Sequence, residues 1–528
     1  MSQTQKRRGR SGSSRLRLHF LGAAGTVTGS LHFFEYTTEE GEVIRFFVDV
    51  GLAQEDESIN YQNRLPSGIK ASDLQFGIIT HAHNDHTGFL PKLYKDGFRG
   101  PVYATPPTCD LMEILLPDSG FLQEEEAAKR LARELRRQQS VRQTKPAKAK
   151  QTSAKQKRNA KQQSSAKVKK EAARPVLPAL YTQQDAVQSL KLLKAVPFDQ
   201  RFQAHKHVFF EYKRASHLLG AAIIVLDVGV GNKARRIVIS GDIGRPDMPV
   251  LKDAVRIKRA DYILCEATYG DRLHPKRDRL EALAEYVNEA HERAVQKAHA
   301  KHGHGMILIP AFAVGRVQSV LFDLRQLMAS GRIAELPVFV DSPMAIKANK
   351  VYRSHTGEYN PKAEAARKKG DPFTTPKFAE LGEAAQSKKL DEPSKEPIIV
   401  ISSSGMASGG RVIQHLKSRL PGTQNTVLFA GFQSDGTLGR QLMANKGEEI
   451  NVGGQDVRVR AKIAHMEDYS GHGDYVDLLN WLSGFTSAPK KVFLVHGDAS
   501  SLAAFKGRVE QKFKWNVHVP HYREYVDL

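Results

Sequence analysis

Four potential metal ligands stand within six residues, directly after an apolar segment of the kind that forms a buried strand. The segment is LQFGIIT, and the ligands that follow it are His81, His83, Asp85 and His86. Side chains two residues apart on an extended chain point to the same side, so His81 and His83 face together. Ligand-type side chains at this density predict a site for two neighbouring metal ions. The fold must therefore bring further ligands to the end of this strand.

Three more candidate ligands lie at the ends of other apolar segments. His217 precedes AAIIVLDV, Asp242 lies just after RRIVIS, and His496 follows KKVFLV. Asp242 has glycines close on both sides, which would let a metal or a substrate approach its carboxylate. A dinuclear site needs a carboxylate that can bridge two ions. We therefore predict that these three side chains complete the metal site.

A second group of histidines is not expected to bind metal. His291, His299, His302 and His304 lie at the polar end of residues 279–301, which have the pattern of a charged amphipathic helix. A solvated helix end explains these residues without an ion.

Basic residues are concentrated in two segments. The chain has 528 residues and a net charge of +22, of which residues 1–17 and 141–175 together carry 17. Residues 141–175 have no apolar face to bury, so we expect disorder there. Such a segment attracts phosphates through counterion release without reading sequence. The alternative is a solubilising segment that has no partner.

The composition argues against a secreted or membrane protein. No run approaches the ~18 apolar residues of a spanning helix, and the N-terminus lacks the apolar core of a secretory signal. Two cysteines, Cys109 and Cys265, cannot form a disulfide framework. We expect a cytoplasmic protein without membrane contact.

The middle of the chain alternates buried strands with helices. Residues 305–328, 336–343 and 396–416 follow the same order of apolar strand, turn and helix. This order predicts a parallel α/β sheet. Residues 18–50 differ, because they consist of alternating strand segments joined by a Gly-rich turn.

The HAHNDH segment resembles the HxHxDH signature of the metallo-β-lactamase fold, and His217 and Asp242 follow in that family's order. The segments CEATYGDR, PAFAVGRVQ, SSSGMASGGRVIQHL, YSGHGDY and VHGD resemble the β-CASP nucleases of the same superfamily. That group includes the pre-mRNA cleavage endonuclease subunit and its bacterial and archaeal ribonuclease relatives. The resemblance covers nearly all of residues 18–528 but not the basic segment 141–175.

The resemblance implies two zinc ions per chain, with Asp242 bridging them. The other ligands divide into two sets: His81, His83 and His217 on one ion, and Asp85, His86 and His496 on the other. Asp49, in FFVDVG, matches an aspartate that orients the ligand loop without binding metal. A histidine at position 496 is typical of the RNA-acting members, whereas DNA-repair members have a different residue there.

The resemblance also implies a catalytic pair. His472 would give a proton to the departing 3′-oxygen, and Glu266 would keep that imidazole protonated and aimed. Two ions with Asp242 between them would activate a water at neutral pH and offset charge on the phosphorus. The expected products are a 5′-phosphate and a 3′-hydroxyl.

A Gly-rich turn between a strand and a helix is a candidate phosphate site. Backbone N–H groups at residues 405–410 and the following helix N-terminus would face a substrate phosphate. The candidate contacts are Ser404, Gly405, Gly409, Gly410 and Arg411, with Arg316 in AVGR as a weaker one. Tight packing explains the glycines equally well.

We expect an α/β protein with a metallo-β-lactamase αββα sandwich and an inserted β-CASP domain. The sandwich would comprise residues 16–270 and 456–528, and the β-CASP domain residues 271–455. Residues 1–15 would be a basic tail. The active site would lie in the cleft between the domains, which would make a single strand thread inward.

The expected function is a zinc-dependent ribonuclease acting on single-stranded RNA, with the basic segments contacting phosphates. The alternatives are a DNA-acting nuclease, a hydrolase of small thioesters or lactams, and an inactive RNA-binding scaffold. Internal cleavage, cleavage from the 5′ end, the natural RNA and the choice between monomer and homodimer stay open.

Overall fold

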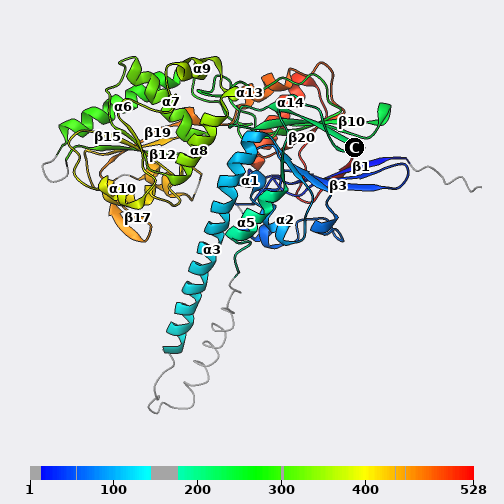
Figure 1. Cartoon of the computed structure of the whole chain (residues 1–528), viewed down its shortest axis with the longest axis horizontal. Coiled ribbons are helices and arrows are strands. Elements are labelled where there is room, and N and C mark those ends of the chain that lie inside the picture. Colours follow the sequence, from blue (N-terminus) through cyan, green and yellow to red (C-terminus); the bar gives the residue numbers. More distant parts are fainter. Residues whose placement is uncertain (1–12, 55, 144–176, 299–302, 435, 446) are drawn as a thin grey trace, which may run out of the picture.

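The computed structural model describes residues 13–54, 56–143, 177–298, 303–434, 436–445 and 447–528. These residues form two lobes with a long helix projecting from the junction between them (Figure 1). Residues 1–12 of the basic tail and residues 144–175 of the basic segment lie outside the described residues. Arg15, which was expected in the tail, is the first residue of a strand. No helix within the described ranges is long and apolar enough to cross a membrane.

The first lobe contains two seven-stranded sheets in the described part of the chain. One has the order β22-β1-β2-β3-β4-β5-β6, with bounds β1 Arg15–Phe20, β2 His32–Thr37, β3 Val43–Val48, β4 Phe76–Ile78, β5 Val102–Ala104, β6 Leu193–Ala195 and β22 Tyr525–Asp527. The other has the order β21-β20-β11-β10-β9-β8-β7, with bounds β7 Phe202–His205, β8 Val208–Arg214, β9 Ala222–Val228, β10 Arg235–Ile239, β11 Tyr262–Glu266, β20 Lys491–Val495 and β21 Val517–His518.

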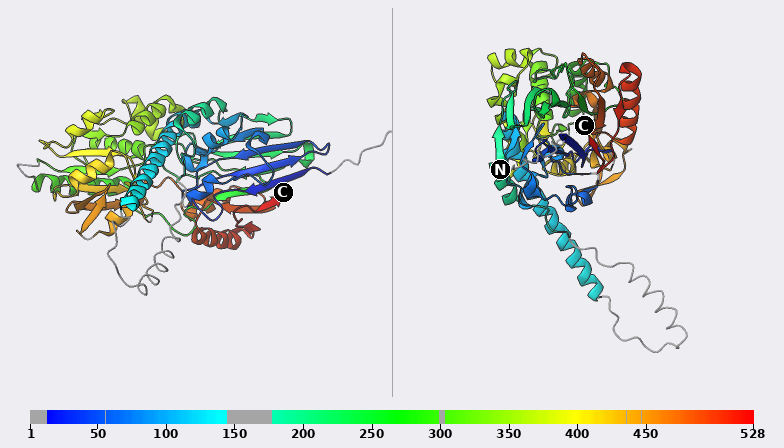
Figure 2. Two further views of the ribbon diagram at one scale, coloured as in Figure 1. Left: turned by 90° about the horizontal axis from the view of Figure 1, so that it is seen from below. Right: turned by 90° about the vertical axis from the view of Figure 1, so that its right-hand side faces the viewer.

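The two sheets pack face to face, and both faces of their strands carry apolar side chains. Phe34 and Phe46 point into the core between the sheets, where their rings stack 5.0 Å apart, whereas Phe33 and Phe47 point to the helices outside. Successive side chains of a strand face opposite sides, so one apolar run serves two cores. The result is the expected αββα sandwich (Figure 2).

Helices cover both outer faces of the sandwich. Those on the first sheet are α1 Asn84–Thr87, α2 Leu90–Lys95, α3 Pro106–Gln143 and α5 Gln183–Ser189, and those on the second are α13 Tyr475–Leu482 and α14 Ala499–Phe513. Trp481 and Phe505 are buried on the second set. The C-terminal strands β20 and β22 each join a different sheet, so the last part of the chain fastens the sandwich together.

The second lobe has one six-stranded sheet whose described strand pairs are all parallel. Its order is β14-β13-β15-β12-β16-β19, with bounds β12 Met306–Pro310, β13 Val338–Val340, β14 Phe378–Glu380, β15 Ile398–Ser402, β16 Thr426–Ala430 and β19 Lys462–Met466. The helices around it are α6 Arg279–Gln296, α7 Arg316–Ala329, α8 Pro343–Ser354, α9 Pro361–Lys368, α10 Ala384–Lys389, α11 Val412–Arg419 and α12 Leu438–Ala444. A hairpin of β17 Glu449–Val452 and β18 Gln455–Arg458 completes the lobe.

The central strand β12 shows why this sheet is parallel and buried. Ile307 and Ile309 belong to one apolar core, and Met306 and Leu308 belong to the core on the other face. Helices cover both faces, so every side chain of the strand is apolar. This confirms the α/β fold class.

One domain boundary differs from the expectation. Residues 456–528 were expected in the sandwich, but β19 pairs with β16 of the second lobe from Thr426 opposite Lys462 to Ala430 opposite Met466. The chain therefore returns to the sandwich after Met466. An apolar strand segment has the same pattern in either lobe, so only its pairing decides where it belongs.

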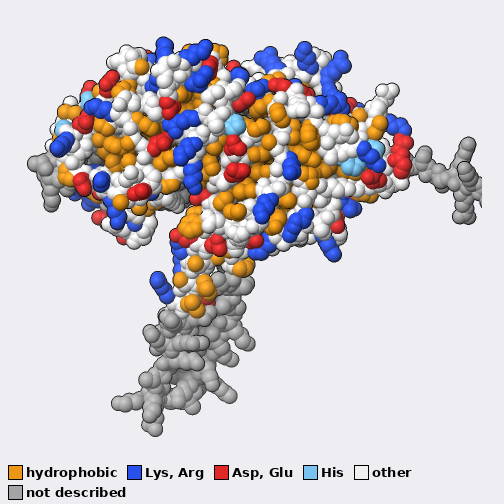
Figure 3. Space-filling model, viewed as in Figure 1, with side chains coloured by type: hydrophobic (Ala, Val, Ile, Leu, Met, Phe, Trp, Pro, Cys, Tyr) orange, Lys and Arg blue, Asp and Glu red, His pale blue; other side chains and the backbone are white. Residues whose placement is uncertain are grey.

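Helix α3 is the long helix that projects from the body. It begins at Pro106 and packs on α5, and Ser119 forms a hydrogen bond with Tyr181 just before α5 (2.8 Å). The helix then runs out of the body (Figures 1 and 2). Phe121 and Leu131 on this stretch are each about half exposed. Apolar side chains are visible along the projecting part (Figure 3).

The two lobes also meet through polar contacts. Arg214 of β8 donates two hydrogen bonds to Glu358 of the second lobe, at 2.7 and 3.1 Å. His355, after α8, lies 2.6 Å from Asp110 of α3. These contacts hold the lobes beside the ends of the strands that carry the candidate ligands.

Candidate metal centre

Asp49 organises the loop that carries the ligand cluster. It follows β3, has φ +57°, and is 1% exposed. Its carboxylate accepts hydrogen bonds from the N–H and the hydroxyl of Thr80, both at 2.8 Å, and lies 2.8 Å from Nδ1 of His86. A bond at Nδ1 leaves Nε2 of His86 for a metal, which is the usual outer-shell support of a histidine ligand.

Four side chains converge as a first ligand group. Nδ1 of His83 lies 3.2 Å from Nε2 of His81 and 3.3 Å from Nε2 of His217. Oδ2 of Asp242 lies 3.4 Å from Nε2 of His81 and 3.6 Å from Nε2 of His217. The four candidate ligand atoms all lie within 4.8 Å of one another.

Three side chains converge as a second group next to the first. The Nε2 atoms of His86 and His496 are 3.2 Å apart, and Oδ2 of Asp85 lies 3.5 Å from Nε2 of His496. Oδ1 of Asp242 lies 3.4 Å from Nε2 of His86 and 3.7 Å from Nδ1 of His496. Asp242 therefore turns one oxygen to each group.

The donor set fits divalent metal. Zn–N bonds of about 2.0–2.1 Å in tetrahedral geometry place two ligand nitrogens roughly 3.3 Å apart, and the imidazole pairs here lie at 3.2–3.3 Å. Oδ1 of Asp242, which faces the second group, is buried and has no hydrogen-bond partner among the described residues. Buried polar atoms of this kind require a partner, and a cation supplies one.

Burial sets the protonation of the first group. It lowers the pKa of His81 and His217 well below the usual range and that of His83 to about 4. Neutral imidazole is the form that binds metal. In the second group burial again opposes charge, but Asp242 and Asp49 outweigh it and raise the pKa of His86 to about 10.

His472 and Glu266 form a pair beside the ligand groups. Nδ1 of His472 lies 3.2 Å from Oε2 of Glu266 and 4.0 Å from Oδ2 of Asp242. The imidazole thus presents Nδ1 to the carboxylate and keeps Nε2 for another partner. Burial opposes its charge, but Glu266 outweighs that effect and raises the pKa of His472 to about 9.

Three residues around this pair were not singled out from the sequence. Thr268 donates to Glu266 at 2.5 Å and lies 3.0 Å from Nδ1 of His496, so it connects the pair to the ligands. Nε2 of His274 lies 2.8 Å from the carbonyl of His472, and the ring of Tyr269 lies 5.9 Å from the His472 ring. In the sequence, only their position two and three residues after Glu266 could have pointed to Thr268 and Tyr269.

The expectation for Arg411 is corrected by its contacts. Its guanidinium donates to buried Asp341 at 2.7 Å, to the Leu381 carbonyl at 2.8 Å and to the Gly382 carbonyl at 2.6 Å. Ion pairing inside the lobe therefore occupies the group that was expected to bind phosphate.

The Gly-rich turn is bonded mainly to itself. The N–H of Ser404 donates to the Gly409 carbonyl at 3.3 Å, and the N–H of Ser408 donates to the Ser404 hydroxyl at 2.8 Å. A Cβ at Gly405 would lie 2.8 Å from the backbone N of Phe312, so packing accounts for that glycine. Gly410 has φ +78°, a conformation that favours glycine.

The remaining histidines stay apart from the centre. His291 and His304 are in none of the His/Cys/Asp/Glu groups with metal-ligand spacing among the described residues, and His299 and His302 lie outside those residues.

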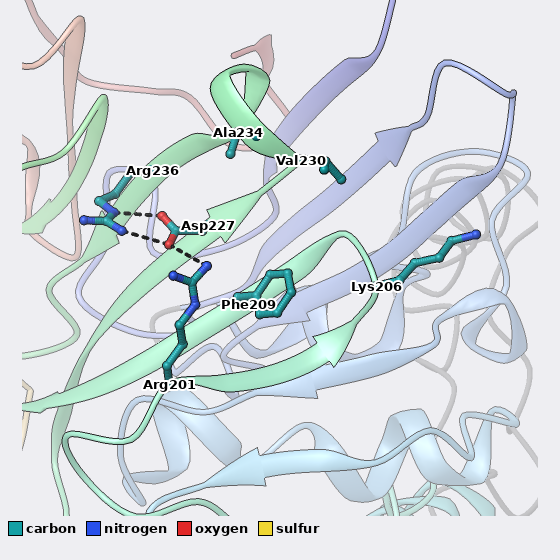
Figure 4. Close-up of a pocket in the computed structure, with 9 residues that line it drawn as sticks. Arg201, Lys206, Phe209, Asp227, Val230, Ala234 and Arg236 are labelled. Carbon is teal, nitrogen blue, oxygen red and sulfur yellow. Dashed lines mark hydrogen bonds and ion pairs between the residues drawn. The ribbon is translucent and has the colours of Figure 1, made fainter.

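A surface cavity of about 520 Å³ lies on strands β7 to β10 and contains none of the predicted site residues (Figure 4). Arg201 and Arg236 line it, and Asp227 pairs with both of them, at 3.5 and 2.8 Å. Its cations are therefore largely neutralised within the chain.

Comparison with known families identifies two segments of the chain. The Beta-Casp domain family matches residues 317–442, and the Zn-dependent metallo-hydrolase RNA specificity domain family matches residues 456–520. The second segment contains both His472 and His496.

Two relatives align with most of the chain. Ribonuclease TTHA0252 of Thermus thermophilus is 29% identical over 489 residues, which are 93% of this chain and 95% of the relative. Transcription termination factor FttA of Methanocaldococcus jannaschii is 28% identical over 519 residues, which are 96% of this chain and 70% of the relative. Among solved structures, the metallo-β-lactamase fold protein YhfI of Bacillus subtilis is 12% identical, covers 48% of this chain and 73% of its own, and has a TM-score of 0.24.

Proposed function

We propose that this chain, which belongs to the β-CASP family of the metallo-β-lactamase superfamily, is a zinc-dependent ribonuclease that hydrolyses phosphodiester bonds of single-stranded RNA. One observation carries the proposal. The Asp242 carboxylate faces two complete ligand groups, and the His472–Glu266 pair stands beside them.

The residues divide into two metal-binding sets with one shared member. His81, His83 and His217 would hold one ion, Asp85, His86 and His496 the other, and Asp242 both. Bound zinc supplies Lewis acidity, which lowers the pKa of water and offsets charge on a phosphodiester. Asp49 keeps Nδ1 of His86 occupied so that Nε2 faces the centre.

The His472–Glu266 pair supplies the proton that the leaving group needs. Glu266 is 1% exposed and is fixed by hydrogen bonds from the Ile243 N–H and the Thr268 hydroxyl, both at 2.5 Å. It holds Nδ1 of His472, so Nε2 is left to donate a proton to the departing 3′-oxygen. This assignment gives a 5′-phosphate on one product and a 3′-hydroxyl on the other.

RNA is the favoured substrate because two findings agree. The segment with His472 and His496 matches an RNA specificity domain, and the relative that aligns with nearly its whole length is a ribonuclease. A small thioester or lactam would not need a second lobe across the centre. An inactive scaffold would not need to retain every ligand and the proton-donating pair.

Labelled RNA tests the proposal. Zinc-loaded protein should cut RNA labelled at the 5′ or the 3′ end, a chelator should stop cleavage, and added zinc should restore it. The products should carry 5′-phosphates that a 5′-phosphate-dependent exonuclease can digest. DNA of the same sequence is the matched substrate control. Failure of loaded protein to cut RNA, or equal cleavage of the DNA, would overturn the proposal.

A further inference from the structure

Two exposed phenylalanines stand where strands of the second lobe end near the proposed catalytic pair. Phe312 follows β12 and is 37% exposed, and Phe432 follows β16 and is 39% exposed. These strands are parallel neighbours, so their C-terminal ends meet at one edge of the sheet, where ligands of such sheets bind. A single exposed apolar side chain needs no explanation, but two at this edge do.

A row of rings connects Phe432 to His472. The ring of Tyr269 lies 6.4 Å from that of Phe432 and 5.9 Å from that of His472. The Arg272 guanidinium lies over both Tyr269 and Phe432, at 5.3 and 5.8 Å from the ring centres. Tyr269 itself is buried, so it links the exposed Phe432 to His472 through ring packing.

Arg316 adds a cation that no described residue of the lobe neutralises. Its guanidinium lies 4.6 Å from the centre of the Phe312 ring and against the backbone at Gly431, where a Cβ would approach Cζ to 2.7 Å. Its Nε and Nη1 are buried and have no hydrogen-bond partner among the described residues. Burial lowers the pKa of Arg316 to about 10 and leaves it charged at neutral pH.

Two other arginines of the same lobe are paired with buried carboxylates. Arg279 donates to buried Asp323 at 2.7 Å, and Arg411 donates to buried Asp341 at the same distance. A buried cation without an anion destabilises the fold. Such unfavourable arrangements are typical of functional sites, where a ligand supplies the missing partner. The anion that Arg316 lacks is therefore expected to come from outside the chain.

We propose that Phe312 and Phe432 stack on bases of the RNA strand while Arg316 binds one of its phosphates, so that these residues position the scissile bond at His472. The inference rests on the proposed ribonuclease function and names the substrate subsite beside it. Every base has a flat face, so stacking on aromatic rings is tolerant of sequence. The bases of a duplex are already stacked on each other, so the subsite selects single strands.

Binding measured in a chelator tests the aromatic part without cleavage. Phe432→Ala should weaken binding of a fluorescent single-stranded RNA roughly 10-fold, whereas Phe432→Trp should bind like the wild type. An RNA with one abasic nucleotide at the subsite should weaken wild-type binding and cause no further loss in Phe432→Ala. Phe121→Ala, an exposed phenylalanine on α3, is the control and should bind normally. Wild-type affinity of both Phe432→Ala and Phe312→Ala would overturn the stacking role.

Arg316→Gln separates a phosphate contact from a packing role. The variant should bind RNA roughly 10-fold more weakly, because hydrogen bonds to charged groups are the strong ones. Its slope of log K against log salt should be shallower by about 0.7, the value for one lost phosphate contact on a single strand. Its Tm should stay equal or rise, because an unpaired buried charge is removed. A lower Tm with an unchanged salt slope would show that Arg316 only packs.

The same measurements distinguish this subsite from the ribonuclease function itself. Retained RNA binding that depends on Phe432 and Arg316, with no cleavage by any zinc-loaded protein, would support the subsite and overturn the catalytic proposal. Cleavage and binding by Phe432→Ala and Arg316→Gln at wild-type levels would overturn the subsite and leave the catalytic proposal standing.

Discussion

Asp242 is the residue on which the proposed dinuclear arrangement depends. Because its two oxygens face different ligand groups, Asp242→Ala should reduce the zinc content from two ions per chain to none, measured by elemental analysis after reconstitution. Asp227→Asn, which changes a carboxylate paired with Arg236 outside the centre, should keep both ions. Loss of a single ion from Asp242→Ala would show that this carboxylate does not bridge.

A variant of His472 tests proton transfer separately from metal binding. Its Nδ1 faces Glu266, so His472→Ala should lower kcat on RNA by ~10²–10⁴-fold while the zinc content stays at the wild-type value. Glu266→Gln should lower kcat less, because the imidazole stays in place without its carboxylate. The measurements are single-turnover cleavage and elemental analysis of each variant. Zinc loss in His472→Ala would make His472 a ligand.

The ligand loop, residues 79–86, depends on one close backbone approach. A Cβ at Gly51 would lie 1.5 Å from the carbonyl oxygen of Asp85, and that carbonyl accepts a hydrogen bond from the N–H of Ser30 at 2.8 Å. Gly51→Ala should therefore displace the loop, lower the free energy of unfolding by about 3 kcal/mol and reduce zinc content. Gly357→Ala, at a glycine with open space around it, should change neither quantity. A fully loaded and stable Gly51→Ala would show that the loop tolerates displacement.

The prediction that the basic segment 141–175 contacts RNA rests on its charge alone. Deleting the segment, which contains twelve Lys and Arg, should weaken RNA binding. The slope of log K against log salt should become shallower by about 0.7 for each lost phosphate contact. Folding, zinc content and turnover at saturating RNA should change little, because the segment has no apolar face for a core. A version of equal length with Lys and Arg changed to Gln is the matched control and should behave like the deletion. Titration of labelled RNA at several salt concentrations decides the question, and an unchanged slope would make the segment an idle linker.

At the scale of the whole molecule, the Arg214–Glu358 pair holds the lobes together beside the centre. The two side chains are 22% and 17% exposed, so we expect a coupling of about 1 kcal/mol in a double-mutant cycle measured by thermal unfolding. Arg214→Ala and Glu358→Ala should then lower Tm, and the double variant should lose less than the sum of the two. The Glu364–Arg367 pair within α9 is the control and should couple by less than about 0.5 kcal/mol. Additive losses at Arg214 and Glu358 would show that other contacts join the lobes.

The sequence by itself predicted the fold class and the side chains that the structure brings together as candidate ligands. Each of His81, His217, Asp242 and His496 stands at the end of an apolar segment, and such segments become strands that expose their ends at a shared edge. Burial pattern and ligand type are local properties, so they can be read without a structure.

The tertiary structure decided what depends on pairing between distant residues. It placed β19 in the second lobe and turned one oxygen of Asp242 to each ligand group. It also joined Arg411 to Asp341, while Arg316 has no anionic partner within the described part of the chain. Strand pairs and ion pairs form between residues far apart in sequence, and the local pattern is the same whichever partner is chosen. Only the folded chain selects the partner, because the choice depends on which surfaces bury each other.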